Sequence, residues 1–165
     1  PTSTYGAIWT FPASLLDPCS SGWQGVTCSQ VPPSNTTCFV QQLALEYYNL
    51  DGGPLPEDIS ALSRLESLNL RNNLVTGAIP MELYTMTAMQ SLRLYNNSIS
   101  GSISSSISNM KSLNKISLGI NQFTGFIPTE IASLTKANIL SLYKNQFNGK
   151  LYKICLYLVF YITLN

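Results

Sequence analysis

The sequence predicts an α/β solenoid, with short parallel strands stacked along one side and short helical turns along another. The first observation is a 24-residue repeat that runs from residue 65 to residue 148, a period typical of stacked architectures. The second is a pair of aliphatic residues at the fourth and sixth places of every unit, which puts both side chains on one face of a short strand. These pairs are Leu68 with Leu70, Leu92 with Leu94, Ile116 with Leu118, and Leu140 with Leu142.

One short strand cannot bury its apolar face alone. We therefore expect successive units to stack and their strands to pair in parallel. Apolar residues at places nineteen and twenty-two, such as Leu83 and Met86, predict a helical turn that closes each unit and faces the core. A glycine at place thirteen suits a positive φ, and the Ile-Pro pair of two units favours an extended return path.

An asparagine recurs at the ninth place, where the chain turns off the strand and its backbone loses ladder partners. An amide offers both donors and an acceptor, so a column of asparagines can satisfy these backbone groups. The predicted structural ladder consists of Asn73, Asn97, Asn121 and Asn145.

The repeats divide the chain into three parts. Residues 1–39 are a predicted N-terminal cap, residues 40–151 the repeat array, and residues 152–165 an apolar C-terminal tail. The predicted array has about five units, which are residues 40–64, 65–88, 89–112, 113–136 and a partial unit at 137–151. The first unit is degenerate, with one extra residue and Tyr48 in place of asparagine, as expected for a terminal repeat.

The pattern LxxLxLxxNxLxGxIPxxLxxLxx resembles the plant-type leucine-rich repeat of receptor-kinase ectodomains and of inhibitors of cell-wall-degrading enzymes. The resemblance extends from about residue 40 to about residue 151. It implies a right-handed solenoid in a horseshoe arc, whose parallel β-sheet lines the concave face. It also implies short extra strands after the asparagine turn, which many members have.

The segment DPCSSGWQGVTC, residues 17–28, resembles the cysteine-containing N-terminal cap of the same family. Such a cap covers the apolar end of a solenoid. A disulfide between Cys19 and Cys28 is favoured and implies an oxidising compartment, while Cys38 leaves a Cys28–Cys38 pairing open. No metal site is predicted, because the spacings lack a CxxC pair and the chain has no histidine.

Composition excludes several function classes. The net charge of +1 gives no basic stripe for nucleic acid. The absence of histidine removes the usual general base, and the adjacent Glu57 and Asp58 would point apart on a helical turn rather than flank one bond. We therefore predict no catalytic residues, no enzyme activity and no cofactor.

Ligand binding is predicted on the concave face, where places three, five, seven and eight vary between units while the framework does not. The candidate ligand-binding residues are Tyr47, Asn69, Arg71, Arg93, Tyr95, Lys115, Tyr143 and Lys144. Aromatic residues and arginine are enriched in binding hot spots, and this set suits an acidic peptide, a C-terminal carboxylate or an anionic sugar polymer. The alternative is that these are ordinary solvated residues of a sheet.

Two glycosylation sequons begin at Asn35 and Asn96. With the disulfide, they favour an extracellular or cell-surface location. Asn96 lies at the edge of the candidate face, so a glycan there would crowd the binding surface.

These observations predict a recognition module for a peptide or protein ligand, as the ectodomain or a fragment of a receptor-like protein. The alternatives are a soluble inhibitor of a cell-wall-degrading enzyme, a carbohydrate-binding protein, or a purely structural surface protein. Cell-wall polysaccharide and a co-receptor are further candidate partners.

Membrane association is expected only through a segment downstream of this chain. The apolar run at residues 154–164 is 11 residues long, and a spanning helix needs about 17–25. The tail is expected to be a cover for the last unit, a truncated anchor or a non-native end. No secretory signal is predicted in residues 1–18, and the start without Met is expected of a mature chain or a fragment.

Overall fold

The computed structural model describes residues 18–19, 23–29, 38–51, 53–148 and 161–163. Seven strands form one sheet in the order β1-β2-β3-β4-β6-β8-β9, and two short strands, β5 and β7, form a second. The strands of the first sheet are β1 Val26–Cys28, β2 Val40–Ala44, β3 Ser67–Asn69, β4 Ser91–Arg93, β6 Lys115–Ser117, β8 Ile139–Ser141 and β9 Tyr161–Thr163. The second sheet pairs β5 Ser100–Gly101 with β7 Gln122–Phe123. Four 3-10 helices close the coils: η1 Glu57–Ala61, η2 Met81–Thr85, η3 Ser105–Asn109 and η4 Thr129–Ser133.

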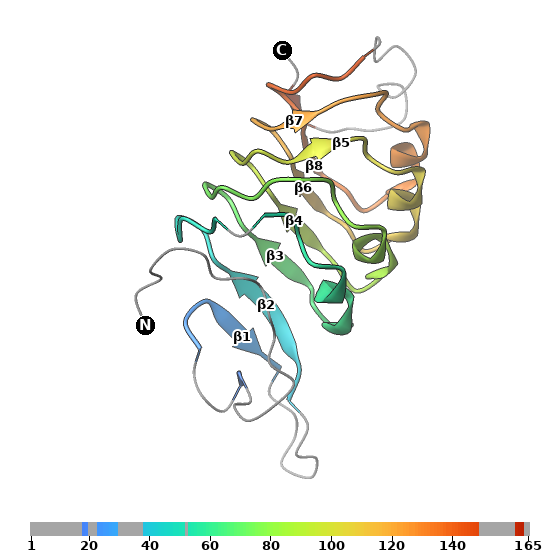
Figure 1. The fold of residues 1–165 in the computed structure, drawn as a ribbon. Coiled ribbons are helices and arrows are strands. Elements are labelled where there is room, and N and C mark those ends of the chain that lie inside the picture. Colours follow the sequence, from blue (N-terminus) through green and yellow to red (C-terminus); the bar gives the residue numbers. More distant parts are fainter. Residues whose placement is uncertain (1–17, 20–22, 30–37, 52, 149–160, 164–165) are drawn as a thin grey trace.

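The strands from β2 to β9 pair in parallel, and equivalent places of neighbouring units face each other. Ser67 lies opposite Ser91, and Ser91 lies opposite Lys115. Figure 1 shows the resulting stack, with the strands along one side of the coil and the 3-10 helices along another. The predicted α/β solenoid is therefore confirmed, with units in register.

One continuous core lies between the sheet and the helices. Leu68, Leu92 and Leu140, from the middle of their strands, are all at most 1% exposed, and Leu83 on η2 is fully buried. Complete burial of such a side chain stabilises the fold by about 1.5–3 kcal/mol. Because each unit contributes the same places, the core extends from the first unit, through Leu43, Leu55 and Ile59, to the fifth.

The 3-10 helices begin where the extended return path ends. Pro80 precedes η2 with φ −66° and ψ 147°, and Pro128 precedes η4 in a similar extended conformation. The unit between them has Ser104 at this place, and the Ser104 hydroxyl accepts a hydrogen bond from the Ser106 backbone N–H at 3.1 Å. A serine N-cap thus replaces proline without loss of the helical turn.

The asparagine side chains at place nine link each unit to the one before it. Asn121 Nδ2 donates to the carbonyl of Leu118 in its own unit at 3.2 Å and to the carbonyl of Leu94 in the preceding unit at 2.9 Å. Its Oδ1 accepts from the Ile99 backbone N–H at 3.0 Å. The same pattern is made by Asn73, Asn97 and Asn145.

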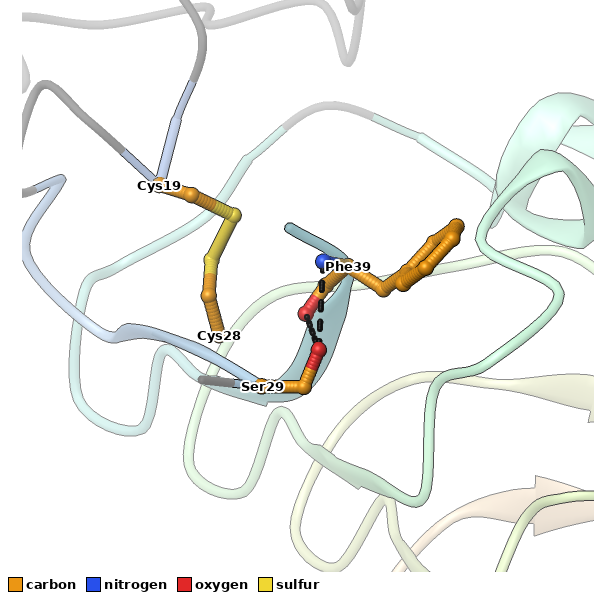
Figure 2. Close-up of a disulfide and its surroundings, with 4 residues drawn as sticks. All are labelled: Cys19, Cys28, Ser29 and Phe39. Carbon is orange, nitrogen blue, oxygen red and sulfur yellow. Dashed lines mark hydrogen bonds between the residues drawn. A yellow bond between two sulfur atoms is a disulfide. The ribbon is translucent and has the colours of Figure 1, made fainter. Parts of the chain in front are cut away.

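The N-terminal cap is joined to the first repeat by an antiparallel pair of strands, β1 and β2. A disulfide links Cys19 to Cys28 with Cα atoms 5.7 Å apart, so the favoured pairing is confirmed and the Cys28–Cys38 alternative is wrong. Figure 2 shows the neighbouring contact, in which the Phe39 backbone N–H donates to the Ser29 hydroxyl at 3.3 Å. The Ser29 backbone N–H donates to the Phe39 carbonyl at 2.8 Å.

At the other end, β9 pairs with β8 and sets Tyr161 opposite Ile139. This part of the tail therefore continues the sheet. The rest of the tail and the sequon at Asn35 lie outside the described residues. Within the described ranges, no helix is both long and apolar enough to cross a membrane.

Candidate ligand-binding face

The candidate site is the side of the parallel sheet that faces away from the core. In β4, Leu92 is 1% exposed while Arg93 reaches solvent, because successive side chains of a strand point to opposite faces. We call this surface the concave face and define it by places three, five, seven and eight of the five units.

The chain leaves the concave face through a left-handed turn at place eight. The residues there have φ between 52° and 63°, and they are Tyr47, Asn72, Asn96, Ile120 and Lys144. Asparagine tolerates this region well, whereas a β-branched residue such as Ile120 is strained in it. Asn96 Nδ2 donates to Asn72 Oδ1 at 2.9 Å, which joins two of these turns. Tyr47 is 74% exposed, and Lys144 is exposed at the same edge of the face.

An ion pair occupies the N-terminal end of the concave face. Glu46 is paired with Arg71 through Nη2, and Arg71 Nε also donates to the same carboxylate oxygen at 3.1 Å. Asn69 Nδ2 donates to that oxygen at 3.1 Å, and Asn69 is only 8% exposed. These hydrogen bonds lower the pKa of Glu46 below its usual value. Two predicted ligand-binding residues, Asn69 and Arg71, therefore already have an intramolecular partner.

Glu46 is absent from the sequence-predicted site. The signal that could have found it is its position, because it holds place seven of the unit that precedes Arg71. In a stacked solenoid, equal places of adjacent units are neighbours. A carboxylate and a guanidinium in consecutive units are thus expected to pair.

Two tyrosines meet across the middle of the concave face, although they are two units apart. The ring centroids of Tyr95 and Tyr143 lie 6.0 Å apart at an interplanar angle of 43°. Gly119 holds place seven between them, and a Cβ there would lie 2.9 Å from two atoms of the Tyr143 ring. The missing side chain of Gly119 therefore lets the rings touch. The hydrogen bond with Tyr95, and secondarily desolvation, raise the pKa of Tyr143.

The two remaining cations of the sheet, Arg93 and Lys115, lie on neighbouring strands. Arg93 faces Ser117 in the strand register, and Lys115 faces Ser91. Their Cα atoms are therefore within about 8 Å of each other, given the spacing of strands and of alternate residues. Among the described residues, neither side chain makes a hydrogen bond or an ion pair.

The structure thus brings most predicted residues onto one face. Asn69, Arg71, Arg93, Tyr95, Lys115 and Tyr143 share it, while Tyr47 and Lys144 lie at the turns along one edge. The described residues hold no cluster of three or more metal-ligating side chains.

Comparison with known proteins identifies the repeats. The Leucine Rich Repeat family model matches residues 64–86 and 88–110. Curated proteins give no significant match. Neither the Leucine Rich Repeat family model nor the matched structures indicate a catalytic family.

Among solved structures, one chain of the BIR3–SERK2 complex from Arabidopsis thaliana has a TM-score of 0.78 and 27% identity over 95% of this chain and 82% of that chain. The ectodomain of the receptor kinase SOBIR1, also from Arabidopsis thaliana, has a TM-score of 0.77 and 26% identity over 87% and 80%. The Arabidopsis complex of the receptor kinase HAESA with the peptide hormone IDA and the co-receptor SERK1 has a TM-score of 0.56 and 32% identity, over 58% of this chain and 16% of the matched chain. This chain therefore carries leucine-rich repeats, and its solenoid is similar to the ectodomains of plant receptor kinases.

Proposed function

We propose that this chain is an extracellular recognition module that binds a peptide or protein ligand on its concave face. The observation that carries the proposal is the gathering of unpaired cations and touching aromatic rings on one face of a sheet, by Arg93, Lys115, Tyr95 and Tyr143. Arginine and tyrosine are typical anchors of protein interfaces. The disulfide supports an extracellular location.

The scaffold favours binding because the face is held in place before a ligand arrives. Each of the strands β2, β3, β4, β6 and β8 is followed by a turn whose backbone is bonded to a ladder asparagine, as in the bonds from Asn97 to the carbonyls of Leu70 and Leu94. Side chains on such a rigid support lose little additional freedom on binding. Similar structures include a receptor kinase with a peptide hormone and co-receptor, and a two-protein complex, which supports a peptide or protein as partner.

A second candidate function is that of a soluble secreted inhibitor of a cell-wall-degrading enzyme, or of a carbohydrate-binding protein. The observation that favours it is the aromatic surface made by Tyr95 and Tyr143, since aromatic faces also stack on sugar rings. The sequence of the full-length transcript distinguishes the receptor from the secreted inhibitor. A reading frame that continues into a membrane span and a kinase supports the receptor, and a stop codon supports the inhibitor.

The proposal is tested by selecting peptides from a displayed random library against the full chain and measuring their affinity by calorimetry. Replacement of Arg71, Arg93 and Tyr95 together by alanine is expected to weaken the selected peptides by more than about tenfold, as loss of hot-spot residues does. Circular dichroism verifies that the triple variant stays folded.

A matched control removes two exposed cations and one exposed aromatic ring elsewhere on the protein. These are Lys111, Lys136 and Phe126, the last of which is 72% exposed. The control variant is expected to bind the selected peptides like the unchanged chain. If the concave-face variant binds the selected peptides as tightly as the control variant does, the concave face is not the binding site.

A further inference from the structure

We propose that Arg93 and Lys115 form an anion-binding subsite on the concave face, which takes the carboxylate of a single acidic residue in an extended peptide ligand. The inference rests on the proposed function, because it names the chemical group that the same face would recognise. It also assigns different roles to the cations that sequence reasoning grouped together.

The concave face is positive although the whole chain is nearly neutral. Its places hold four cations and one carboxylate, namely Arg71, Arg93, Lys115, Lys144 and Glu46. Acidic residues gather instead in the first turns of the 3-10 helices, at Glu57, Asp58, Glu82 and Glu130. The helices lie along a different side of the coil from the strands (Figure 1). An anionic group is therefore attracted to the sheet rather than to the helices.

Only some of these cations are available to a ligand. Arg71 is already bonded through Nε and Nη2 to Glu46. Within the part of the chain that the structure describes, Arg93 and Lys115 have no such partner. Arg93 and Lys115 are diagonal neighbours on adjacent strands, so an anion between them is attracted by both positive charges.

A third donor lies at the same position. Ser91 is directly opposite Lys115 and two residues before Arg93 on the same strand face. Ser91 is 9% exposed, and its buried hydroxyl has no hydrogen-bond partner among the described residues. Buried hydroxyl groups are nearly always hydrogen-bonded. A ligand oxygen entering between the two cations would supply the missing acceptor.

The neighbours of the subsite restrict the shape and charge of the ligand. On one flank Glu46 has a lowered pKa and stays ionised, so it disfavours a second acidic residue there. On the other flank Tyr95, two places after Arg93, forms the aromatic surface with Tyr143. The forked guanidinium of Arg93 matches a carboxylate with two parallel bonds. The expected ligand segment is one acidic residue followed by an apolar or aromatic one.

The test uses fluorescence anisotropy of the full chain with two labelled hexapeptides, Gly-Gly-Glu-Phe-Gly-Gly and the same peptide with glutamine for glutamate. The glutamate peptide is expected to bind about tenfold more tightly, as charge-assisted hydrogen bonds imply, with a difference that shrinks as salt rises. Arg93→Gln together with Lys115→Gln should abolish the difference, and Ser91→Ala should reduce it. Lys136→Gln, which removes an exposed cation outside the concave face, should leave it unchanged.

The possible outcomes separate this inference from the proposed function. Equal binding of the two hexapeptides, or no binding at millimolar peptide, overturns the anion subsite. The proposed function still stands in that case if the variant with Arg71, Arg93 and Tyr95 replaced no longer binds the library-selected peptides. Binding of a uronic-acid oligosaccharide without preference for the glutamate peptide would likewise overturn the inference and favour a sugar ligand.

Discussion

Replacement of Asn121 by alanine tests the idea that buried amides hold the coils together. Asn121 is 9% exposed, and its side chain bonds to four backbone groups at 2.9–3.3 Å. One of them, the Gly119 carbonyl, also accepts from the Asn96 backbone N–H. The carbonyls of Leu94 and Leu118 each keep a second asparagine donor, at 3.0 Å in both cases. The Ile99 N–H has no other acceptor among the described residues.

The expected loss of stability comes mainly from the Ile99 N–H, which is left without an acceptor, while the carbonyls keep a donor. One orphaned buried N–H costs about 1–3 kcal/mol, and carbonyls that keep a partner lose less. We therefore expect Asn121→Ala to reduce the free energy of unfolding by about 1–3 kcal/mol. Urea denaturation followed by far-UV circular dichroism measures this change, and amide hydrogen exchange should become faster at Ile99.

Asn138→Ala is the matched control, because the side chain of Asn138 is exposed and makes no hydrogen bond to another described residue. Surface substitutions of this kind usually change stability by less than about 0.5 kcal/mol. If the two variants unfold at the same urea concentration with the same slope, the reasoning about stranded backbone groups is refuted.

Three further predictions concern the cap and the concave face. Reduction of the disulfide should lower the melting temperature, with a loss of about 2–3 kcal/mol, and mass mapping of the intact protein should recover a Cys19–Cys28 peptide; a different linked peptide would contradict the structure. Gly119→Ala should separate the two tyrosine rings and shift the pKa of Tyr143 downward, as measured by ultraviolet titration. The raised pKa of Tyr143 contributes stability that is present below its ordinary value near 10 and is lost at higher pH. If Gly119→Ala leaves the stability of the protein at alkaline pH unchanged, the ring contact is contradicted. Glu46→Gln should make stability less dependent on pH below 4.5, because the lowered pKa of the Glu46 carboxyl contributes stability that is lost as pH falls through it. If the variant and the unchanged chain lose stability identically as pH falls, the ion pair is ruled out.

The framework of the fold was predictable because its information is local and repeated. Aliphatic residues two apart, repeated at the same places of every unit, indicate a short strand, and the constant period sets each strand against its equivalent in the next unit. The register of Leu68 with Leu92, and of Leu92 with Ile116, follows directly. The ladder of asparagines was predictable for the same reason. The Cys19–Cys28 bond needed the family resemblance as well, since three cysteines in the cap allowed another pairing.

The candidate site was predictable only as a set of places, because the contacts within it depend on the reach of particular side chains between units. Glu46 neutralises Arg71 from the preceding coil, and Asn69 is drawn into the same contact. Gly119 lets Tyr143 reach Tyr95 by leaving out a side chain.

The sequence by itself determined that this protein is a stack of coils, because its repeated pattern specifies the same local structure and the same neighbour for every unit. The tertiary structure alone decided that Glu46 pairs with Arg71, and that Arg93 and Lys115 have no such partner among the described residues. Charge and side-chain contact depend on distance in space, and residues about one repeat apart in sequence become neighbours only when the coils stack.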